Sequence, residues 1–415
     1  MGKTRNRVSR ATWFTGSTPI AASPDVIVIG AGAIGASAAY HLARQGVKVL
    51  VLEKEAEPAR HQSGRNSGVI HAGYNLKPGT LKAKYCVEGS RQLRDYCRER
   101  GIPMVEGGIL VVARREEERR TLGELHCRAQ GNGVRTELVA GDEIPRIEPH
   151  ARGIEALHAP EGASFDAEAY VRSLLAEATR LGAEVRCGIT VRRVREGSAV
   201  SVDTSAGPFS ASALLNCAGL YADRIAGPVA RDLRIIPFRG YYAEVVPERR
   251  YLVRSHVYAV PDLTFPFLGV HLSRRVDGRV IVGPGAMLAL GREAYRFAQV
   301  NFRDVLGTLT WPGFYSMFRE ARFRSLVVSE VRKSLSLAAV WREAQALVPE
   351  LRRGDLVRSF AGNRAQVVSR TGELVDDIVV RETPKAVHVL NAVSPGLTCS
   401  LPFGEYLAAL VRRVR

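Results

Sequence analysis

A glycine-rich turn near the start of the chain has the residue types and spacing that bind a diphosphate. Gly30, Gly32 and Gly35 follow an uninterrupted apolar run, Val26 to Ile29, and precede an alanine-rich segment typical of a helix. The first glycine of such a pattern permits a tight turn, the second lets the backbone approach a pyrophosphate, and the third lets helix and strand pack closely. Glu53 ends the next apolar run and can accept hydrogen bonds from an adenosine ribose. These residues predict a dinucleotide-binding turn.

A second glycine-rich cluster follows, from Ser63 to Gly73. Three glycines, small polar side chains and Arg65 can lie against the diphosphate and a flat ring, with backbone amides pointing inward. A fold that binds only a nicotinamide dinucleotide does not need this cluster, so it favours a flavin dinucleotide. The alternative is a mobile surface loop.

Regular elements must position these clusters. Residues 25–52 predict a strand, a helix and a second strand of a parallel sheet, each strand buried on both faces. Asp166 predicts the N-cap of a helix that ends near Gly182. Further strands are expected at 183–187, 191–195, 200–204, 209–216, 241–246, 280–282 and 387–390, and a helix at the C-terminus.

The order of these elements predicts an α/β protein with two lobes. We expect a Rossmann-like nucleotide-binding lobe built from the discontinuous segments 25–90, 151–236 and 347–415. Residues 91–150 and 237–346 would form an α+β substrate lobe with a mixed or antiparallel sheet. Residues 1–24 are basic, lack an apolar periodicity and predict a flexible tail.

Composition places the chain among globular proteins, with 46% hydrophobic and 24% charged residues. The net charge of +17 favours contact with anionic surfaces, including peripheral contact with a membrane. Arginines are interleaved with glutamates, as in 114–120, and no recognition motif accompanies them, so we expect no specific nucleic-acid partner. Six cysteines without a CxxC pair indicate buried thiols in a reducing compartment, hence the cytoplasm, and no metal site is expected.

Several motifs together resemble the L-2-hydroxyglutarate dehydrogenase/oxidase family, a branch of the D-amino-acid-oxidase-like flavoproteins. The similarity covers about Asp25 to Leu410. The motifs that carry it are Val26 to Glu53, HQSGRNSGVIHAG at 61–73, PFRGYY at 237–242, VPD at 260–262, FPFLGVH at 265–271, AGNRAQ at 361–366 and NAVSP at 391–395.

The resemblance implies a bound FAD and oxidation of a small L-2-hydroxy acid to the 2-oxo acid, with electrons passing to oxygen or a quinone-linked acceptor. The residues it implies for FAD binding are Gly30, Gly32, Gly35, Glu53, Lys54, Asn66, Ser67, Gly68, Val69, Ala218, Gly219, Ser394, Pro395 and Gly396.

The resemblance also supplies candidates for catalysis. Such a reaction moves the C2 hydride to flavin N5 while a base takes the hydroxyl proton. His71 and His271 occupy motif positions, and either imidazole could be that base. Substrate carboxylates are commonly bound by arginine, and Arg364 and Arg239 are the candidates by motif position. The tyrosines that could donate to a carboxylate are Tyr258 and Tyr242.

Two other functions stay open at the level of sequence. Several segments near the expected substrate site depart from the family pattern, among them Tyr74 to Leu76 and Pro284 to Met287. These departures permit an amine or amino-acid oxidase of the same superfamily. The net charge of +17 permits a nucleic-acid or membrane-surface binder with a vestigial flavin fold.

Overall fold

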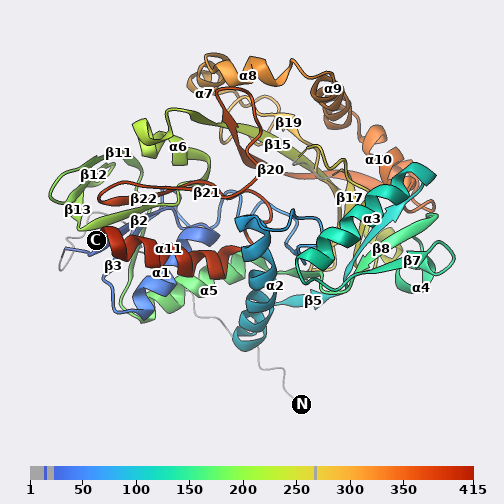
Figure 1. Ribbon diagram of the computed structural model, residues 1–415, viewed down its shortest axis with the longest axis horizontal. Coiled ribbons are helices and arrows are strands. Elements are labelled where there is room, and N and C mark those ends of the chain that lie inside the picture. Colours follow the sequence, from blue (N-terminus) through green and yellow to red (C-terminus); the bar gives the residue numbers. More distant parts are fainter. Residues whose placement is uncertain (1–13, 16–22, 266–268) are drawn as a thin grey trace.

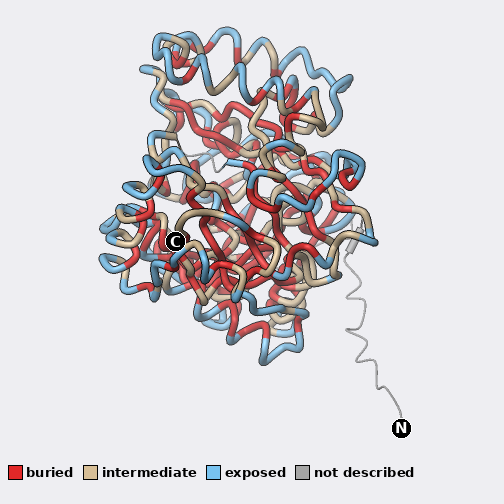
Figure 2. Tube along the Cα trace, turned by 90° about the vertical axis from the view of Figure 1, so that its right-hand side faces the viewer, coloured by how far each residue is buried: buried red, intermediate tan, exposed pale blue. Residues whose placement is uncertain are grey.

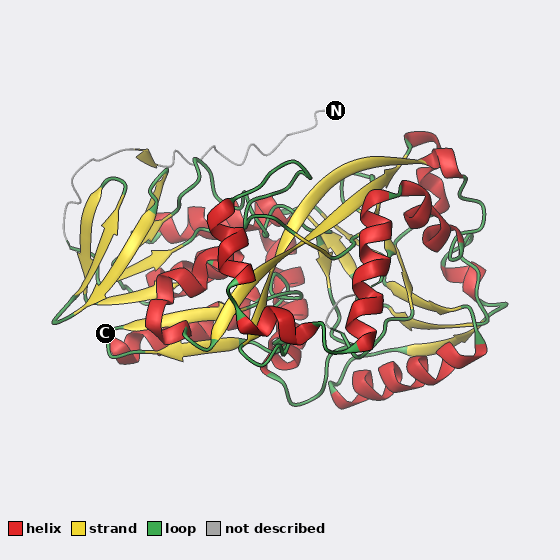
Figure 3. Cartoon of the chain, turned by 90° about the horizontal axis from the view of Figure 1, so that it is seen from above, coloured by secondary structure: helices red, strands yellow, loops and turns green. Residues whose placement is uncertain are grey.

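The computed structural model describes residues 14–15, 23–265 and 269–415. Two large sheets lie side by side along the long axis, with helices around them (Figures 1 and 3). Buried positions run through the middle of the molecule, and exposed positions lie on the outer helices and loops (Figure 2). Within the described residues, no helix combines the length and apolarity needed to cross a membrane.

The first sheet has seven strands, parallel except for the last. Their order is β1 (Phe14–Thr15), β10 (Glu184–Cys187), β3 (Val49–Leu52), β2 (Val26–Ile29), β14 (Ala213–Asn216), β22 (Ala386–Asn391) and β21 (Val379–Glu382). The surrounding helices are α1 (Ala33–Arg44), α2 (Leu81–Arg100), α5 (Ala167–Arg180), α6 (Ala222–Ala226) and α11 (Ser400–Val414). A three-stranded sheet, β11 (Val191–Glu196), β12 (Val200–Thr204) and β13 (Gly207–Ala211), covers the other face.

The predicted strand–helix–strand unit at 25–52 is confirmed. Val26 and Val28 pack with residues of α1, α5 and α11, whereas Ile27 and Ile29 pack with the three-stranded sheet. Alternate side chains of a strand point to opposite faces, so a strand buried on both faces needs an uninterrupted apolar run. The helix predicted after Asp166 is α5, and the Asp166 carboxylate accepts from the Ala169 amide at 2.9 Å.

The second sheet is mixed and has nine strands. They are β19 (Met287–Leu288), β15 (Leu233–Val245), β18 (Val280–Gly283), β17 (His271–Arg274), β16 (His256–Ala259), β6 (Ile109–Ala113), β8 (Glu155–Ala159) and β7 (Glu137–Ala140), with β20 (Leu356–Ser369) paired to β15. Its helices are α3 (Glu116–Gly131), α4 (Ile144–Ile147), α7 (Phe302–Leu309), α8 (Pro312–Met317), α9 (Ala321–Leu335) and α10 (Leu337–Gln345). A small sheet of β4 (Val69–Ile70), β9 (Ala163–Phe165) and β5 (Met104–Glu106) lies between the lobes.

The chain differs from the expected domain boundaries in three places. Strands β8 and β20 belong to the second sheet, although their residues were expected in the nucleotide-binding lobe. Helix α2 runs on to Arg100 and packs on the first lobe through Leu93 and Cys97. Each difference arises because a single element crosses the proposed edge or pairs with a distant strand, and neither is visible in local composition.

One strand, the cysteines and the N-terminal segment also differ from what the sequence predicts. The strand expected at 209–216 is two strands, β13 and β14, which belong to different sheets. The cysteines are free thiols, but Cys127 is exposed and Cys217 half-buried, so not all are buried as expected. Of the expected tail, β1 pairs with β10, while residues 1–13 and 16–22 lie outside the described part of the chain.

Candidate functional site

A cavity of about 1130 Å³ runs between the two lobes. It begins at the carboxyl ends of β2, β3 and β14 and continues to β15, β17 and β20 of the second sheet. The carboxyl edge of a parallel sheet is where such folds bind nucleotides. The cavity therefore joins the glycine-rich motifs to residues of the second lobe.

The first glycine turn has the geometry that its sequence predicts. Gly30 has a φ of +99°, and a Cβ there would lie 2.5 Å from the carbonyl oxygen of Cys217. A Cβ on Gly35 would collide with the Gly30 carbonyl oxygen. Glu53 accepts from the Ala31 amide at 2.8 Å and from the Glu55 amide at 2.9 Å, so its carboxylate also braces the turn.

The second cluster lies beside this turn and also lines the cavity. The Ala33 amide donates to Ser63 Oγ at 2.9 Å, which ties the loop to the start of α1. The Asn66 amide donates to the carbonyls of Gln62 and Ser63, and its Oδ1 accepts from the Gly68 amide at 2.7 Å. Asn66 therefore builds the loop that places Ser67 and Val69 along the cavity.

Among the predicted cofactor residues, Gly35 and Gly68 do not line the cavity. The remaining candidates come from segments far apart in the sequence and do line it. They are Lys54, Ala218, Gly219, Ser394, Pro395 and Gly396. The Asn216 carboxamide oxygen accepts from the Ala218 amide at 3.1 Å and holds the end of β14. The structure thus brings the residues expected around one dinucleotide to one surface.

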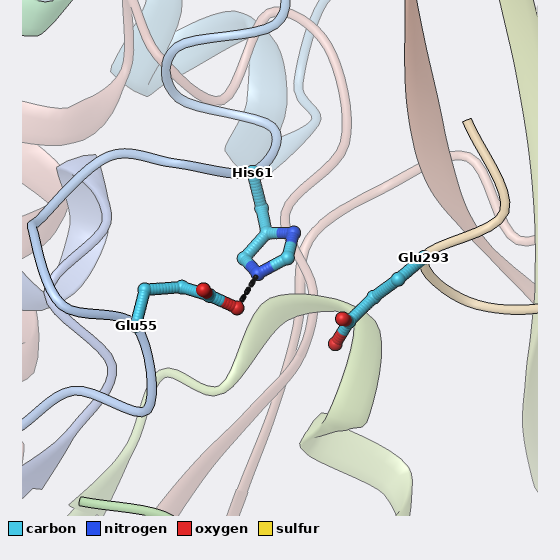
Figure 4. Close-up of side chains that lie close together, drawn as sticks. All are labelled: Glu55, His61 and Glu293. Carbon is cyan, nitrogen blue, oxygen red and sulfur yellow. Dashed lines mark hydrogen bonds and ion pairs between the residues drawn. The ribbon is translucent and has the colours of Figure 1, made fainter. Parts of the chain in front are cut away.

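Glu55, His61 and Glu293 lie close together beside the cavity (Figure 4), and Lys54 pairs with both carboxylates of this cluster. The Lys54 ammonium pairs with Glu55 and lies 2.5 Å from a Glu293 carboxylate oxygen. His61 bonds Glu55 at 2.9 Å through Nε2 and the Tyr295 hydroxyl at 2.6 Å through Nδ1. Glu55, His61 and Glu293 offer three ligand atoms within 4.8 Å, but the Lys54 ammonium already supplies the cation between the two carboxylates.

His71 and His271 both line the cavity at its other end. Burial lowers the pKa of each imidazole to about 4, and repulsion between the two protonated forms adds to the lowering at His271. His271 Nδ1 lies 3.0 Å from the Gly269 carbonyl oxygen, which fixes the proton on Nδ1 and leaves Nε2 as a proton acceptor. Both histidines are therefore neutral at pH 7.

Tyr258 lies behind His271 and not on the cavity wall. The two residues are paired across β16 and β17, and their rings stack with centroids 4.1 Å apart. The expectation that Tyr258 donates to a substrate carboxylate is therefore wrong, and its contact orients the imidazole. Behind Tyr258, His256 is also buried, and burial lowers its pKa to about 3.

Arg239 does not line the cavity, contrary to the expectation from its motif position. In β15 the residues that line the cavity are Phe238, Gly240 and Tyr242. Because neighbours in a strand face opposite sides, Arg239 points away. Its guanidinium donates to the carbonyls of Ala294 and Arg296, at 3.0 and 2.7 Å. Arg239 therefore holds the 294–296 segment in place and does not reach a substrate.

Arg364 lines the cavity, as expected, and lies opposite Phe238 in the β15–β20 pair. Its Nε donates to Gln366 Oε1 at 3.0 Å. The Gln366 amide nitrogen in turn donates to the carbonyls of Val367 and Val375, so Gln366 orients the guanidinium. Burial lowers the pKa of Arg364 to about 10, which still leaves it charged at neutral pH.

A second cation in this part of the cavity is Lys82, which sequence reasoning did not single out. Lys82 is 4% exposed, lines the cavity and pairs with Asp376 at 2.6 Å. Burial lowers its pKa, and the nearby Arg364 charge contributes. The Asp376 carboxylate pairs with Lys82 and also favours the charged form of Arg364, and all three side chains line this end of the cavity, where the two cations suit an anion.

The donors in the cavity fit FAD. Gly32 precedes α1 without a side chain that could cap it, and Gly32 and Ile34 line the cavity, where the amino end of the helix suits a diphosphate. The space left by Gly30 and Gly35 allows no side chain. When bound, FAD supplies a two-electron acceptor that Gly30, Glu53, Ser67 and Gly396 would help to hold.

Comparisons with known proteins agree with this geometry. Residues 25–410 match the family of FAD dependent oxidoreductases. The chain is 41% identical to L-2-hydroxyglutarate dehydrogenase of Indibacter alkaliphilus over 386 residues, covering 91% of this chain and 96% of the relative. It is 35% identical to the L-2-hydroxyglutarate dehydrogenase of Escherichia coli strain K12, over 94% of this chain and 93% of that one.

Solved structures share the fold. L-alpha-glycerophosphate oxidase from Mycoplasma pneumoniae, with FAD bound, matches with a TM-score of 0.78 and 24% identity, over 94% of this chain and 95% of that chain. Glycine oxidase from Geobacillus kaustophilus matches with a TM-score of 0.71 and 19% identity, over the same shares. The chain belongs to the family of FAD dependent oxidoreductases, and FAD is its cofactor.

Proposed function

We propose that this protein oxidises L-2-hydroxyglutarate to 2-oxoglutarate. The observation that carries the proposal is the meeting of two neutral histidines with two buried cations, Arg364 and Lys82, in one FAD-binding cavity. Relatives that match more than nine-tenths of the chain are L-2-hydroxyglutarate dehydrogenases. A 2-hydroxy dicarboxylate would place its two carboxylates on the two cations and its hydroxyl group between the flavin and an imidazole.

His271 is the base in this proposal. Its Nε2 carries a lone pair because Nδ1 donates to the Gly269 carbonyl, and the Tyr258 ring holds the imidazole plane. As the C2–H bond breaks and its electron pair leaves as hydride, the hydroxyl proton moves to Nε2 and the C2–O bond becomes a carbonyl. His71, on the same cavity wall, is the alternative proton acceptor.

The two carboxylates of the substrate are assigned to the two cations. Arg364 presents a planar guanidinium oriented by Gln366 and is suited to the C1 carboxylate next to the reacting carbon. Lys82 presents a single ammonium beside Asp376 and is suited to the distal carboxylate. This assignment predicts a preference for dicarboxylates over monocarboxylic 2-hydroxy acids.

The electrons leave the reduced cofactor for oxygen or for a quinone-linked acceptor. Oxygen consumption and reduction of a soluble quinone, measured in parallel on one preparation, distinguish these acceptors. We also propose that the protein, with its net charge of +17, contacts a membrane surface peripherally.

The test is anaerobic mixing of the purified yellow protein with L-2-hydroxyglutarate. We expect loss of the visible flavin absorbance and one 2-oxoglutarate per flavin, with no loss on addition of the D enantiomer. Bleaching by amino acids with release of ammonia, and none by any 2-hydroxy acid, would instead identify an amino-acid oxidase of the same family.

A further inference from the structure

Helix α7 turns its apolar face away from the protein interior, and part of the apolar surface of α9 is exposed as well. A surface helix of a globular protein normally turns its apolar stripe inward. Both of these helices lie along one outer edge of the molecule, joined by α8 (Figures 1 and 2). Their outward-facing apolar residues, called the α7–α9 face here, are Phe302, Leu306, Leu309, Val328, Val331 and Leu335.

In α7 the reversal is fixed by buried charge. Asp304 and Thr308 are 5% and 6% exposed, whereas Phe302 and Leu306 are 83% and 63% exposed. The Asp304 carboxylate accepts from the Arg292 amide at 2.8 Å and from the Arg224 guanidinium at 2.5 Å. Rotating α7 to bury its apolar stripe would break these bonds and leave a buried carboxylate without partners.

Helix α9 shows the pattern in part, because Phe323 is buried and Leu326 and Val327 pack against the core. Glu330 and Ser334 are 6% and 3% exposed, whereas Val328 and Leu335 are 70% and 62% exposed. The Glu330 carboxylate accepts from the Ala286 amide at 2.6 Å and pairs with Lys333. Ala286 lines the cavity, so this bond ties α9 to the site while Val328, Val331 and Leu335 stay exposed.

The short connection between these helices is also ordered by side-chain packing. Phe318, after α8, lies 5.3 Å from the Phe314 ring and 5.4 Å from the Phe323 ring of α9. This aromatic row fixes the end of α8 against α9. The α7–α9 face is therefore supported from beneath by packed residues.

The charge around the α7–α9 face is strongly positive. Between residues 302 and 335 the exposed basic residues are Arg303, Arg319, Arg322, Arg324 and Arg332. The exposed acidic residue in the same range is Glu320, because Asp304 and Glu330 are buried. A second copy of the chain in symmetric contact would bring these arginines against one another, which disfavours self-association through this face.

We propose that the α7–α9 face docks the protein on an anionic lipid bilayer, which gives the proposed membrane contact its location. Apolar side chains of α7 and α9 enter the boundary between headgroups and acyl chains, and the surrounding arginines bind lipid phosphates. The docking does not depend on the identity of the substrate. Arg303 is both on α7 and on the cavity wall, so the docked face adjoins the cavity.

Co-sedimentation of the FAD-loaded protein with lipid vesicles tests the proposal. We expect binding to phosphatidylglycerol-containing vesicles, little binding to pure phosphatidylcholine vesicles, and weaker binding as salt is raised. Changing Phe302, Leu306, Val328 and Leu335 to serine together should weaken binding more than about tenfold. The control changes Leu138 of β7 and Val105 of β5, which are 45% and 46% exposed away from this face, to serine and should bind like the unchanged protein.

Flavin reduction by L-2-hydroxyglutarate is measured on the same preparations, so failure of the docking and failure of the proposed reaction are separate results. Three outcomes would overturn the docking proposal. They are equal binding by the fourfold variant, a dimer that the fourfold variant loses, and binding to soluble poly-L-glutamate without binding to anionic vesicles.

Discussion

The two ends of the cavity are built in different ways. The nucleotide end is organised around one continuous unit, 26–52, whose glycine turn offers backbone amides and leaves no room for side chains, although more distant segments also line it. The substrate end combines His71 after β4, Lys82 of α2, His271 of β17 and Arg364 of β20. Binding by backbone is therefore encoded locally, whereas the acid–base and charge chemistry depends on how distant strands pair. Substitutions at the two ends should have different signatures.

The largest effect is expected at the nucleotide end. In Gly35→Val the side chain would collide with the Gly30 carbonyl, so α1 would be displaced and the purified protein should hold no FAD. Flavin absorbance per polypeptide is the measurement. Gly123→Ala, in an open position of α3, is the control and should keep its FAD. A yellow Gly35→Val protein with full flavin content would remove the turn from the cofactor site.

The substrate end should lose rate and keep its colour. His271→Ala removes the base, so the rate constant of anaerobic flavin reduction should fall about 10² to 10⁴-fold while FAD content is unchanged. His126→Ala, on α3 and not on the cavity wall, should behave like the unchanged protein. If His71→Ala shows this loss and His271→Ala does not, the base is His71.

A Lys82 substitution tests whether the substrate end binds the distal carboxylate. Lys82→Gln should raise KM for L-2-hydroxyglutarate about 10- to 100-fold, since a charge-assisted bond contributes about 1.5 to 3 kcal/mol. The KM for L-2-hydroxybutyrate, which lacks the distal carboxylate, should change little. Lys84→Gln, exposed on the same helix, is the control. An equal rise in KM for both substrates would show that Lys82 supports the fold of the site and not the distal carboxylate.

The smallest effect is expected from pH, because kcat/KM should change little near neutrality. Burial lowers the pKa of His271 from 6.5 to about 4, so the imidazole stays in its proton-accepting form as the pH falls from 7 toward 5. The acid limb of kcat/KM should therefore lie below about pH 5, where protonation of the base begins. A half-loss of kcat/KM near pH 6.5 would mean that the base is not buried.

The sequence predicts the nucleotide end well because its signals are local. The glycine spacing, the apolar run of β2 and the N-cap at Asp166 each act within a few residues of the element they specify. His71, His271 and Arg364 were identified through the family resemblance, and the structure places all three on the cavity wall.

Residues that depend on strand register could not be predicted from the sequence. Arg239 belongs to the same motif as Tyr242, but the alternation of β15 turns it away from the cavity. Tyr258 pairs with His271 only through the β16–β17 register. Nothing in the sequence around Lys82 distinguishes it from the other lysines, because its burial comes from packing of α2 near Asp376 and Arg364.

The central claim is that one cavity holds FAD at its glycine-rich end and L-2-hydroxyglutarate at its histidine end, with hydride leaving C2. Single-turnover flavin reduction with L-2-hydroxyglutarate carrying deuterium at C2 tests it most directly. The account predicts bleaching of the flavin at a rate slower than with the protiated substrate. Absence of bleaching with either isotopologue would contradict it.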